Sequence, residues 1–383
     1  MIGSKLSRRR LLALGGAAGL SVACTRKRSS GFQGNAYVAN ENASTLAVVD
    51  LSSFTVIKQI QLDSAATEVI SHPQRSSVYA LAPTAGVIYE IDTEKIAIRN
   101  KTLVARSAAA TMRLGPDDRS IWCLNPQDQR LVRLDLERNA IDTRIDIGPE
   151  ASSFELARCF EAGGHVDRAA VAYSGRGCFR LIDMRRAKAL PEVQVSERIG
   201  SIRFLSDGKS LMIANTAKRA LTAVEATEGR IITNLQLAVS PDNLCFNQDG
   251  GQLFVTGEGS HALVVVYPYY LPQVAETVLA GHAPGAMAAS DNLLFIANPL
   301  AGEVSILNIV RRKVVAVASV GAEPAHITIT PDDQYALVLN RKSGDMAVIR
   351  TAAVVPDRRK TAALFTMIPV GSRPVSAVVK AFA

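Results

Sequence analysis

Residues of the kinds that mark common catalytic or metal centres are scarce in this sequence. Aromatic residues make up 5% of the 383 positions, with one tryptophan, and only five histidines are present. The five cysteines form no CxxC or CxxCH pattern, so neither a zinc ribbon nor covalently attached haem is indicated. No nucleophile elbow, phosphate-cradling loop or HExxH motif occurs. Four cysteines are expected to be buried thiols: Cys123, Cys159, Cys178 and Cys245.

The excess of basic over acidic residues is too small to indicate nucleic-acid binding. The formal charge is +8, and four basic residues before Cys24, with no acidic residue beside them, account for half of it. The rest of the chain has no basic stripe interleaved with aromatic residues, which is the usual mark of a nucleic-acid surface. We therefore expect no nucleic-acid partner.

Residues 1–23 are predicted to be an export signal. A basic start precedes an apolar run from Leu11 to Val22, which is shorter than the roughly 20 residues of a membrane-spanning helix. The segment SRRRLL at 7–12 resembles the twin-arginine export motif. The segment SVAC at 21–24 resembles a lipobox, in which the cysteine is acylated and becomes the new amino terminus.

These resemblances imply a protein anchored by a lipid at Cys24 to the cell envelope, facing the periplasm or the surface. Residues 24–34 are polar and basic and are expected to form a flexible tether. The alternative is a soluble exported protein that is cleaved nearby.

A pattern of short alternating strands recurs along the rest of the chain. Each second alternating run closes at intervals of 41 to 48 residues, on Asp50, Asp92, Asp135, Asp183, Glu225, Tyr267, Asn308 and Arg350. A period near 42 residues with strand-type alternation is typical of a β-propeller, in which each repeat forms one four-stranded blade. We therefore predict an all-β propeller domain over residues 35–383.

One full unit is VGAEPAHITITPDDQYALVLNRKSGDMAVIR, which begins at Val320. It resembles the YVTN family of bacterial β-propeller repeats, and the resemblance extends from Asn35 to the end of the chain. The third and fourth units depart from the pattern at ARSAAATMRLGPDD and FEAGGHVDR. The resemblance implies the fold but no particular activity, because the matching positions mostly build blades.

The two ends of the chain predict how the ring closes. The first unit starts at its second strand, AYVAN, whereas the chain ends in GSRPVSAVVKAFA, which matches an isolated inner strand. The carboxyl terminus is therefore expected to supply the inner strand of the first blade and to cover an open sheet edge. This arrangement gives eight blades; seven is the alternative, because many relatives are thought to have seven.

Polar residues recur at the start of the inner strands. Strand alternation should point them away from the core and into the central channel. The predicted ligand-binding residues are Glu68, Thr111, Ser153, Ser201, Asn243, His326 and Ser376, with Ala286 at the eighth position. A solvated channel that holds no ligand is the alternative.

The loops that enter these strands add charged groups to the same rim: Arg106, Glu150, Arg198, His282, Glu323 and Arg373. His282 and His326 lie in adjacent blades and could converge with Glu323. Two histidines with scattered acids make a weak case for a metal, so no metal and no cofactor is predicted. The remaining histidines, His72, His165 and His261, are expected on surface loops.

The resulting hypothesis is a monomeric, non-enzymatic lipoprotein that binds a small molecule or a protein in the cell envelope. The alternative is an enzyme that uses the mouth of the channel. The resemblance allows a lactonase-like hydrolase or a cofactor-associated oxidoreductase, since related propellers include both. A hydrolase would draw its catalytic residues from His326, Glu68, Glu323, His282 and Arg373.

Overall fold

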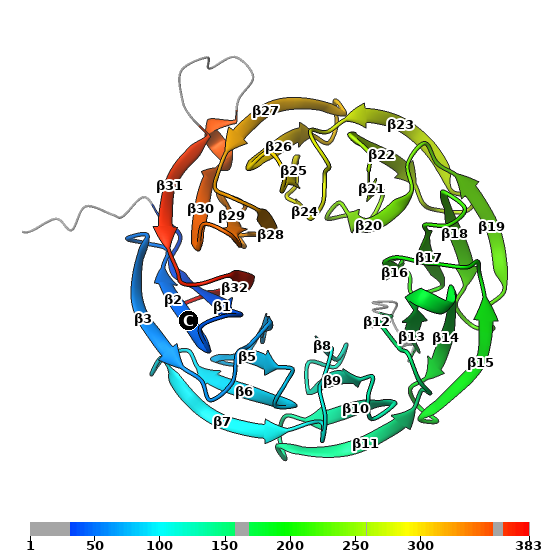
Figure 1. The fold of residues 1–383 in the computed structure, drawn as a ribbon, viewed down its shortest axis with the longest axis horizontal. Helices are drawn as coiled ribbons and strands as arrows, with labels where there is room; N and C mark the ends of the chain where they lie inside the picture. Colours follow the sequence, from blue (N-terminus) through cyan, green and yellow to red (C-terminus); the bar gives the residue numbers. More distant parts are fainter. Residues whose placement is uncertain (1–30, 158–167, 258, 355–362, 383) are drawn as a thin grey trace, which may run out of the picture. The chain divides into compact units, whose positions relative to one another are not determined.

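The computed structural model describes residues 31–157, 168–257, 259–354 and 363–382. These residues form eight four-stranded antiparallel sheets arranged in a ring (Figure 1). The prediction of an eight-bladed β-propeller is confirmed, and the seven-bladed alternative is wrong. The predicted signal, Cys24, Cys159 and His165 lie outside the described residues. In the described part of the chain, no helix is long and apolar enough to cross a membrane.

Each blade contributes one strand to each of four concentric positions. The innermost strands are β32 (Pro374–Ala381), β4 (Glu68–Ser71), β8 (Thr111–Leu114), β12 (Ser153–Leu156), β16 (Ile202–Phe204), β20 (Pro241–Phe246), β24 (Met287–Ala289) and β28 (Pro324–Ile329). The second strands are β1 (Gly34–Asn40), β5 (Ser77–Ala82), β9 (Ser120–Asn125), β13 (Arg168–Tyr173), β17 (Ser210–Asn215), β21 (Leu253–Gly257), β25 (Leu293–Asn298) and β29 (Tyr335–Asn340).

The third strands are β2 (Thr45–Asp50), β6 (Val87–Asp92), β10 (Arg130–Asp135), β14 (Cys178–Asp183), β18 (Ala220–Glu225), β22 (Ala262–Tyr267), β26 (Glu303–Asn308) and β30 (Asp345–Arg350). The outer strands are β3 (Thr55–Gln61), β7 (Ala97–Leu103), β11 (Ala140–Asp146), β15 (Lys188–Gln194), β19 (Ile231–Gln236), β23 (Gln273–Leu279), β27 (Lys313–Ser319) and β31 (Leu364–Pro369). Two short 3₁₀ helices, η1 (Ser174–Arg176) and η2 (Thr351–Ala353), follow β13 and β30.

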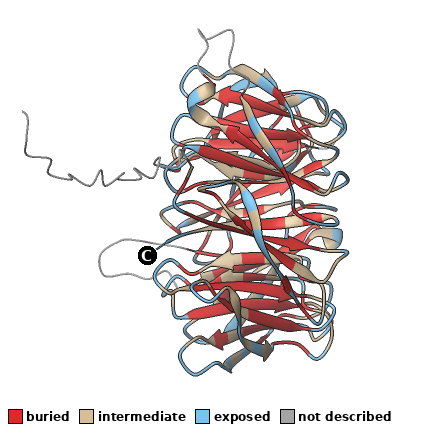
Figure 2. Ribbon diagram, turned by 90° about the vertical axis from the view of Figure 1, so that its left-hand side faces the viewer, coloured by how far each residue is buried: buried red, intermediate tan, exposed pale blue. Residues whose placement is uncertain are grey.

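The hydrophobic core lies between neighbouring blades. In β1, β5 and β9 every residue is buried, because the second strand of a blade has another blade packed on each face (Figure 2). One such cluster joins Tyr79 and Leu81 of the second blade to Met112 and Cys123 of the third. The outer strand β11 instead alternates exposed and less exposed residues, as expected for a strand with one wet face.

The carboxyl-terminal strand closes the ring as the sequence predicts. The sheet order is β3-β2-β1-β32, and Tyr37 of β1 pairs with Val378 of β32 (Figure 1). The main-chain groups of β1 and β32 therefore hydrogen-bond to each other, so neither strand leaves this edge open to another chain. The folded unit begins earlier than predicted, since Gly34 belongs to β1 and Phe32 packs into the core, so residues 31–34 are not part of a tether.

A buried asparagine at the end of the second strand links some blades to the blade before. Nδ2 of Asn125 donates to the carbonyl of Val104, 2.7 Å away at the end of the preceding blade. Nδ2 of Asn40 donates in the same way to Val370 at 2.9 Å. Gly371 lies against this asparagine with a φ of 134°, and a Cβ placed there would be 2.5 Å from Nδ2 of Asn40. Glycine is therefore strongly favoured at position 371.

Candidate functional site

Charged side chains form a ladder along the inner strands of four successive blades. Glu68 of β4 pairs with Arg113 of β8, with Oε1 and Nη1 2.6 Å apart. Arg113 lies 3.7 Å from Glu155 of β12, and Glu155 lies 3.3 Å from Nη1 of Arg203 of β16. Acid and base alternate from blade to blade, and all four side chains remain partly exposed. This charged ladder, Glu68–Arg113–Glu155–Arg203, runs along the inner strands of four of the eight blades.

Glu68 anchors one end of the charged ladder. Its Oε2 accepts hydrogen bonds from the hydroxyl of Thr111 at 2.8 Å and from the main-chain N–H of Met112 at 2.7 Å. Together with Arg113, these donors use both carboxylate oxygens. A carboxylate whose two oxygens are both engaged by neighbouring donors is poorly placed to take a proton from a substrate.

Arg203 ends the charged ladder with donors to spare. Its Nη1 contacts Glu155 and also donates to the carbonyl of Ile202 at 3.0 Å, and the side chain is 39% exposed. Within the described residues, Glu155 is the one carboxylate that pairs with it. An arginine carries five N–H donors in a fixed fork, so Arg203 can still bind an anion in the channel.

Cys245 of β20 lies in the electrostatic field of Arg203, one blade further round. Burial raises the pKa of its thiol to about 11, and the positive charge of Arg203 offsets only part of that effect. The thiol is therefore protonated at neutral pH. A protonated thiol is a weak nucleophile, and Cys245 packs against the apolar cluster between its blade and the next.

The opposite half of the ring carries a histidine on one of its inner strands. Nε2 of His326 in β28 lies 3.2 Å from the carbonyl oxygen of Ala377 in β32. Since a carbonyl can only accept, Nε2 carries the proton in this hydrogen bond, and Nδ1 keeps a lone pair in the neutral ring. Burial lowers the pKa of His326 below its ordinary value, which favours the neutral form.

Two of the rim residues named from the sequence, Arg373 and His282, are engaged in other contacts. Nε of Arg373 pairs with Glu41 at 2.7 Å. The ring of His282 stacks on that of His261, with centroids 4.7 Å apart and an interplanar angle of 21°. Within the described residues, no side-chain contact joins Glu323 to either His282 or His326, and no three His, Cys, Asp or Glu residues are grouped to hold a metal ion.

The predicted polar ring is spread around the channel. Thr111 reaches Glu68, and the hydroxyl of Ser376 accepts the N–H of Val69 at 3.2 Å. Ser153, Ser201 and Asn243 are half-exposed and belong to three successive blades, and among the described residues no side-chain hydrogen bond joins them. The predicted polar positions therefore supply separate hydrogen-bonding groups, whereas the charged ladder brings charged side chains close together.

Sequence reasoning missed three members of the charged ladder: Arg113, Glu155 and Arg203. The first two stand two residues after Thr111 and Ser153, and Arg203 stands two residues after Ser201. Alternation along a strand places residues i and i+2 on one face, so this second position should also have been assigned to the channel. Extending the polar ring by one strand period would have found all three.

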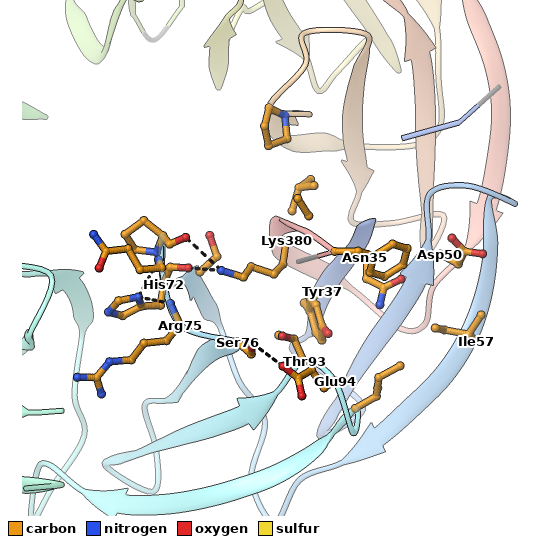
Figure 3. A pocket seen from close by; sticks show the side chains of 18 residues that line it. Asn35, Tyr37, Asp50, Ile57, His72, Arg75, Ser76, Thr93, Glu94 and Lys380 are labelled. Atoms are coloured by element: carbon orange, nitrogen blue, oxygen red, sulfur yellow. Dashed lines mark hydrogen bonds between the residues drawn. The ribbon is translucent and has the colours of Figure 1, made fainter. Parts of the chain in front are cut away.

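A large cavity lies at the seam where the ring closes. This seam cavity of about 860 Å³ is bordered by β1, the end of β32 and the turns of the second blade, and includes Asn35, Tyr37, His72 and Lys380 (Figure 3). Nζ of Lys380 donates to the carbonyl of His72 at 2.5 Å, which fastens the carboxyl-terminal strand to the second blade. Burial raises the pKa of Tyr37 to about 12, so its hydroxyl stays neutral.

His72 is buried in this seam, which corrects its assignment to a surface loop. It is 2% exposed, and its Nδ1 accepts the N–H groups of Gln74 and Arg75. Nε2 lies 2.6 Å from the carbonyl oxygen of Asp118 in the third blade. The turn after β4 folds its main chain around the imidazole, so the ring bridges two blades. His261 is exposed, as predicted.

Several solved structures share this architecture at low sequence identity. The dihydro-heme d1 dehydrogenase NirN in complex with DHE is 13% identical, with a TM-score of 0.70 over 90% of this chain and 75% of that one. AztD from Citrobacter koseri in its apo form is 12% identical, with a TM-score of 0.65 over 92% and 100%. A protein of unknown function from Desulfotomaculum acetoxidans is 12% identical, with a TM-score of 0.62 over 91% and 100%.

These likenesses establish the fold alone. The chain is a β-propeller. No protein-family model matches it, and the search of curated proteins found no match. The resemblance of its repeats to the YVTN pattern therefore stays a prediction, and the function of this propeller must be argued from its own residues.

Proposed function

We propose that this propeller is a non-enzymatic binding protein of the bacterial cell envelope, and that its channel binds a small molecule bearing carboxylates. The observation that carries the proposal is Arg203, a partly exposed guanidinium at the open end of the charged ladder. Glu155 lies between Arg203 and Arg113 in the order of the blades. Arg113 therefore provides a second positive charge along the same inner strands. Planar guanidinium groups match the bidentate geometry of a carboxylate.

The residues proposed from the sequence as a catalytic set have other partners. Glu68 is held by three donors, Arg373 is paired with Glu41, and His282 stacks on another ring. Hydrolysis of a lactone requires a base and a group that polarises the carbonyl close to one reacting atom. Binding makes no such demand, because a spread ring of polar groups and two arginines suffices to hold an anion.

The cellular part of the proposal rests on the amino-terminal sequence. The basic start, the short apolar run and the residues before Cys24 support export and lipid attachment at that cysteine. Replacing Cys24 with serine should move the protein from the membrane fraction to the soluble envelope fraction and abolish labelling by a palmitate analogue. Retention of the label in Cys24→Ser would refute the anchor but would leave the channel proposal untouched.

Binding in the channel is tested with purified protein and a panel of mono-, di- and tricarboxylates, measured by calorimetry and thermal shift. At least one compound with two or more carboxylates should bind saturably, and Arg203→Gln should weaken that binding about tenfold, the equivalent of about 1.4 kcal/mol. Arg230→Gln serves as the matched control, because Arg230 is an exposed arginine just before β19, the outer strand of the same blade. Turnover of the bound compound, or equal binding by Arg203→Gln, would contradict the proposal.

A protein partner is the competing outcome. If a tagged full-length protein repeatedly recovers one envelope protein from membranes, and that recovery survives Arg203→Gln, the channel is not the binding site. The propeller would then act as a scaffold through its loops. If recovery is lost in Arg203→Gln but not in Arg230→Gln, the partner presents an acidic group to the channel.

A tetrapyrrole is the second candidate ligand. It is favoured by the likeness to NirN, which was solved in complex with DHE, and by the two arginines and the neutral His326 of this channel. Haem-type macrocycles carry several carboxylates, which Arg113 and Arg203 could pair with, and a neutral imidazole is a metal ligand. Haemin titration followed by absorbance tests this: a saturable spectral change that His326→Ala alters and Arg203→Gln weakens supports it, and a spectrum that both variants share with the wild type refutes it.

A further inference from the structure

A second cavity lies away from the channel, between the second and third blades. It has a volume of about 520 Å³, within the usual range for small-molecule sites. Its lining combines buried aliphatic groups with three arginines: Val104, Ala105, Val132, Arg106, Arg130 and Arg144, among others. This cavity, called the arginine pocket below, is formed by the end of β7, the turn between β9 and β10, and β11.

The strand register brings two of the arginines together. Val132 of β10 pairs with Arg144 of β11, and Arg130 stands two residues before Val132 on the same face. Arg130 and Arg144 are therefore diagonal neighbours, roughly 7–8 Å apart at their Cα atoms. Both are exposed beyond the buried Val132, so their guanidinium groups surround an apolar floor.

The third arginine is positioned by Asp128. One carboxylate oxygen of Asp128 accepts the main-chain N–H of Arg106 at 2.9 Å, and the other accepts the hydroxyl of Ser107 at 2.6 Å. These donors hold the loop after β7 against the turn between β9 and β10. The hydrogen bond from Ser107 is also the largest of the effects that lower the pKa of Asp128, so the carboxylate stays charged.

The charged Asp128 offsets only part of the positive charge of the arginine pocket. Among the described residues, no ion pair or side-chain hydrogen bond engages Arg106, Arg130 or Arg144. Asp146 lies opposite Arg130 in the register, but its carboxylate accepts the N–H of Gly148 instead. Three arginines around one cavity, with the only acid of the lining already bound to two donors, form a site for an anion of two or more charges.

We propose that the arginine pocket binds a small phosphorylated molecule, with the phosphate held by Arg106, Arg130 and Arg144. A phosphate dianion offers three oxygens, which several guanidinium forks can contact at once. The aliphatic floor at Val104 and Val132 can cover a less polar part of the ligand. This site is independent of the channel proposal, because none of its residues belongs to the charged ladder.

The experiment is a titration of the purified full-length protein with inorganic phosphate, sulfate, glycerol 3-phosphate and a hexose phosphate, by calorimetry at low and high salt. A phosphate ester should bind saturably and more tightly than inorganic phosphate, and added salt should weaken it. The affinity of the double variant Arg130→Gln/Arg144→Gln for the phosphate ester should be about a hundredfold lower, since each lost arginine contact is worth about tenfold in affinity. Arg138→Gln, an exposed arginine at the far turn of the same β10–β11 hairpin, is the matched control.

Three results would overturn the proposal. They are the lack of saturable binding of any phosphate ester, equal binding by the double variant, and binding only to vesicles of anionic phospholipid but not to soluble esters. Arg203→Gln separates this site from the channel, since it should leave phosphate-ester binding unchanged. Unchanged thermal unfolding of the double variant without ligand confirms that a loss of binding is not a loss of fold.

Discussion

The side-chain amide of Asn40 donates to the main-chain carbonyl of Val370 at 2.9 Å, although 330 positions separate the two residues in the chain. The bond joins the first blade to the end of the eighth. It lies beside Gly371, where the chain turns inward to become the strand that completes the first blade. The ends of the ring are therefore held by a side-chain contact as well as by strand pairing.

Gly371→Ala should weaken this junction. The φ of 134° strains any residue with a Cβ, and that Cβ would lie 2.5 Å from Nδ2 of Asn40. We expect a loss of about 1–3 kcal/mol in the free energy of unfolding, measured by urea denaturation. Gly175→Ala is the control, because an added Cβ there meets nothing within 4 Å. Equal stability of the two variants would show that the junction does not constrain position 371.

His72→Phe should destabilise the seam while it keeps a ring of similar volume. The substitution leaves the N–H groups of Gln74 and Arg75 and the carbonyl of Asp118 without their imidazole partner in a buried place. Each unsatisfied buried group costs about 1–3 kcal/mol, so the melting temperature should fall clearly. His261→Phe, at an exposed position, should change it little. A surface role for His72 predicts no difference between the two variants.

Glu155→Gln should affect stability little and anion binding more. Its ion pairs with Arg113 and Arg203 are partly exposed, and such pairs are worth about 0–1 kcal/mol. Removing the negative charge leaves two arginines on the channel wall without their shared carboxylate. Carboxylate ligands of the channel should therefore bind more tightly to Glu155→Gln than to the wild type in calorimetric titrations. Weaker binding would mean that Glu155 positions Arg203 rather than competing with the ligand.

His326 should make stability depend on pH in the mildly acidic range. Burial lowers its pKa below the unfolded value of about 6.5, so the unfolded chain binds the proton more readily. Stability is then complete above pH 6.5 and falls as the pH drops through that value toward the folded pKa, by up to about 1.4 kcal/mol per unit. Denaturant midpoints measured between about pH 7 and about pH 5 should therefore decline more steeply for the wild type than for His326→Gln. Parallel curves would show that this histidine titrates normally.

The fold was predictable because the sequence contains eight similar repeats. Where the strand pattern of one repeat is ambiguous, the equivalent strands of the other seven support its assignment. The third and fourth units, which depart from the repeat pattern, still form blades because β8 and β12 carry buried residues such as Met112 and Phe154 in alternation. Closure was predictable from the unmatched first and last strands. The start of the folded unit at Gly31 was not predictable, because the burial of Phe32 depends on a neighbouring blade.

The site was predictable only in part. Strand alternation predicted that Glu68 and Thr111 face the channel. Their hydrogen-bond partners depend on which side chains of adjacent blades meet. The sequence of a single repeat does not show which side chains meet between blades. His72 illustrates the limit, because its burial comes from the turn that folds around it and from Asp118 of another blade. Interactions between repeats, rather than within them, decide these positions.

Disulfide trapping tests the closed ring most directly, and the positions of the channel and of both cavities depend on that ring. Ala36 of β1 and Val379 of β32 are paired across the seam, so cysteines at both positions should form a disulfide under mild oxidation. We predict near-complete cross-linking in Ala36→Cys/Val379→Cys, seen as a mobility shift without reductant, and none in either single variant. A double variant that folds but does not cross-link would contradict the account.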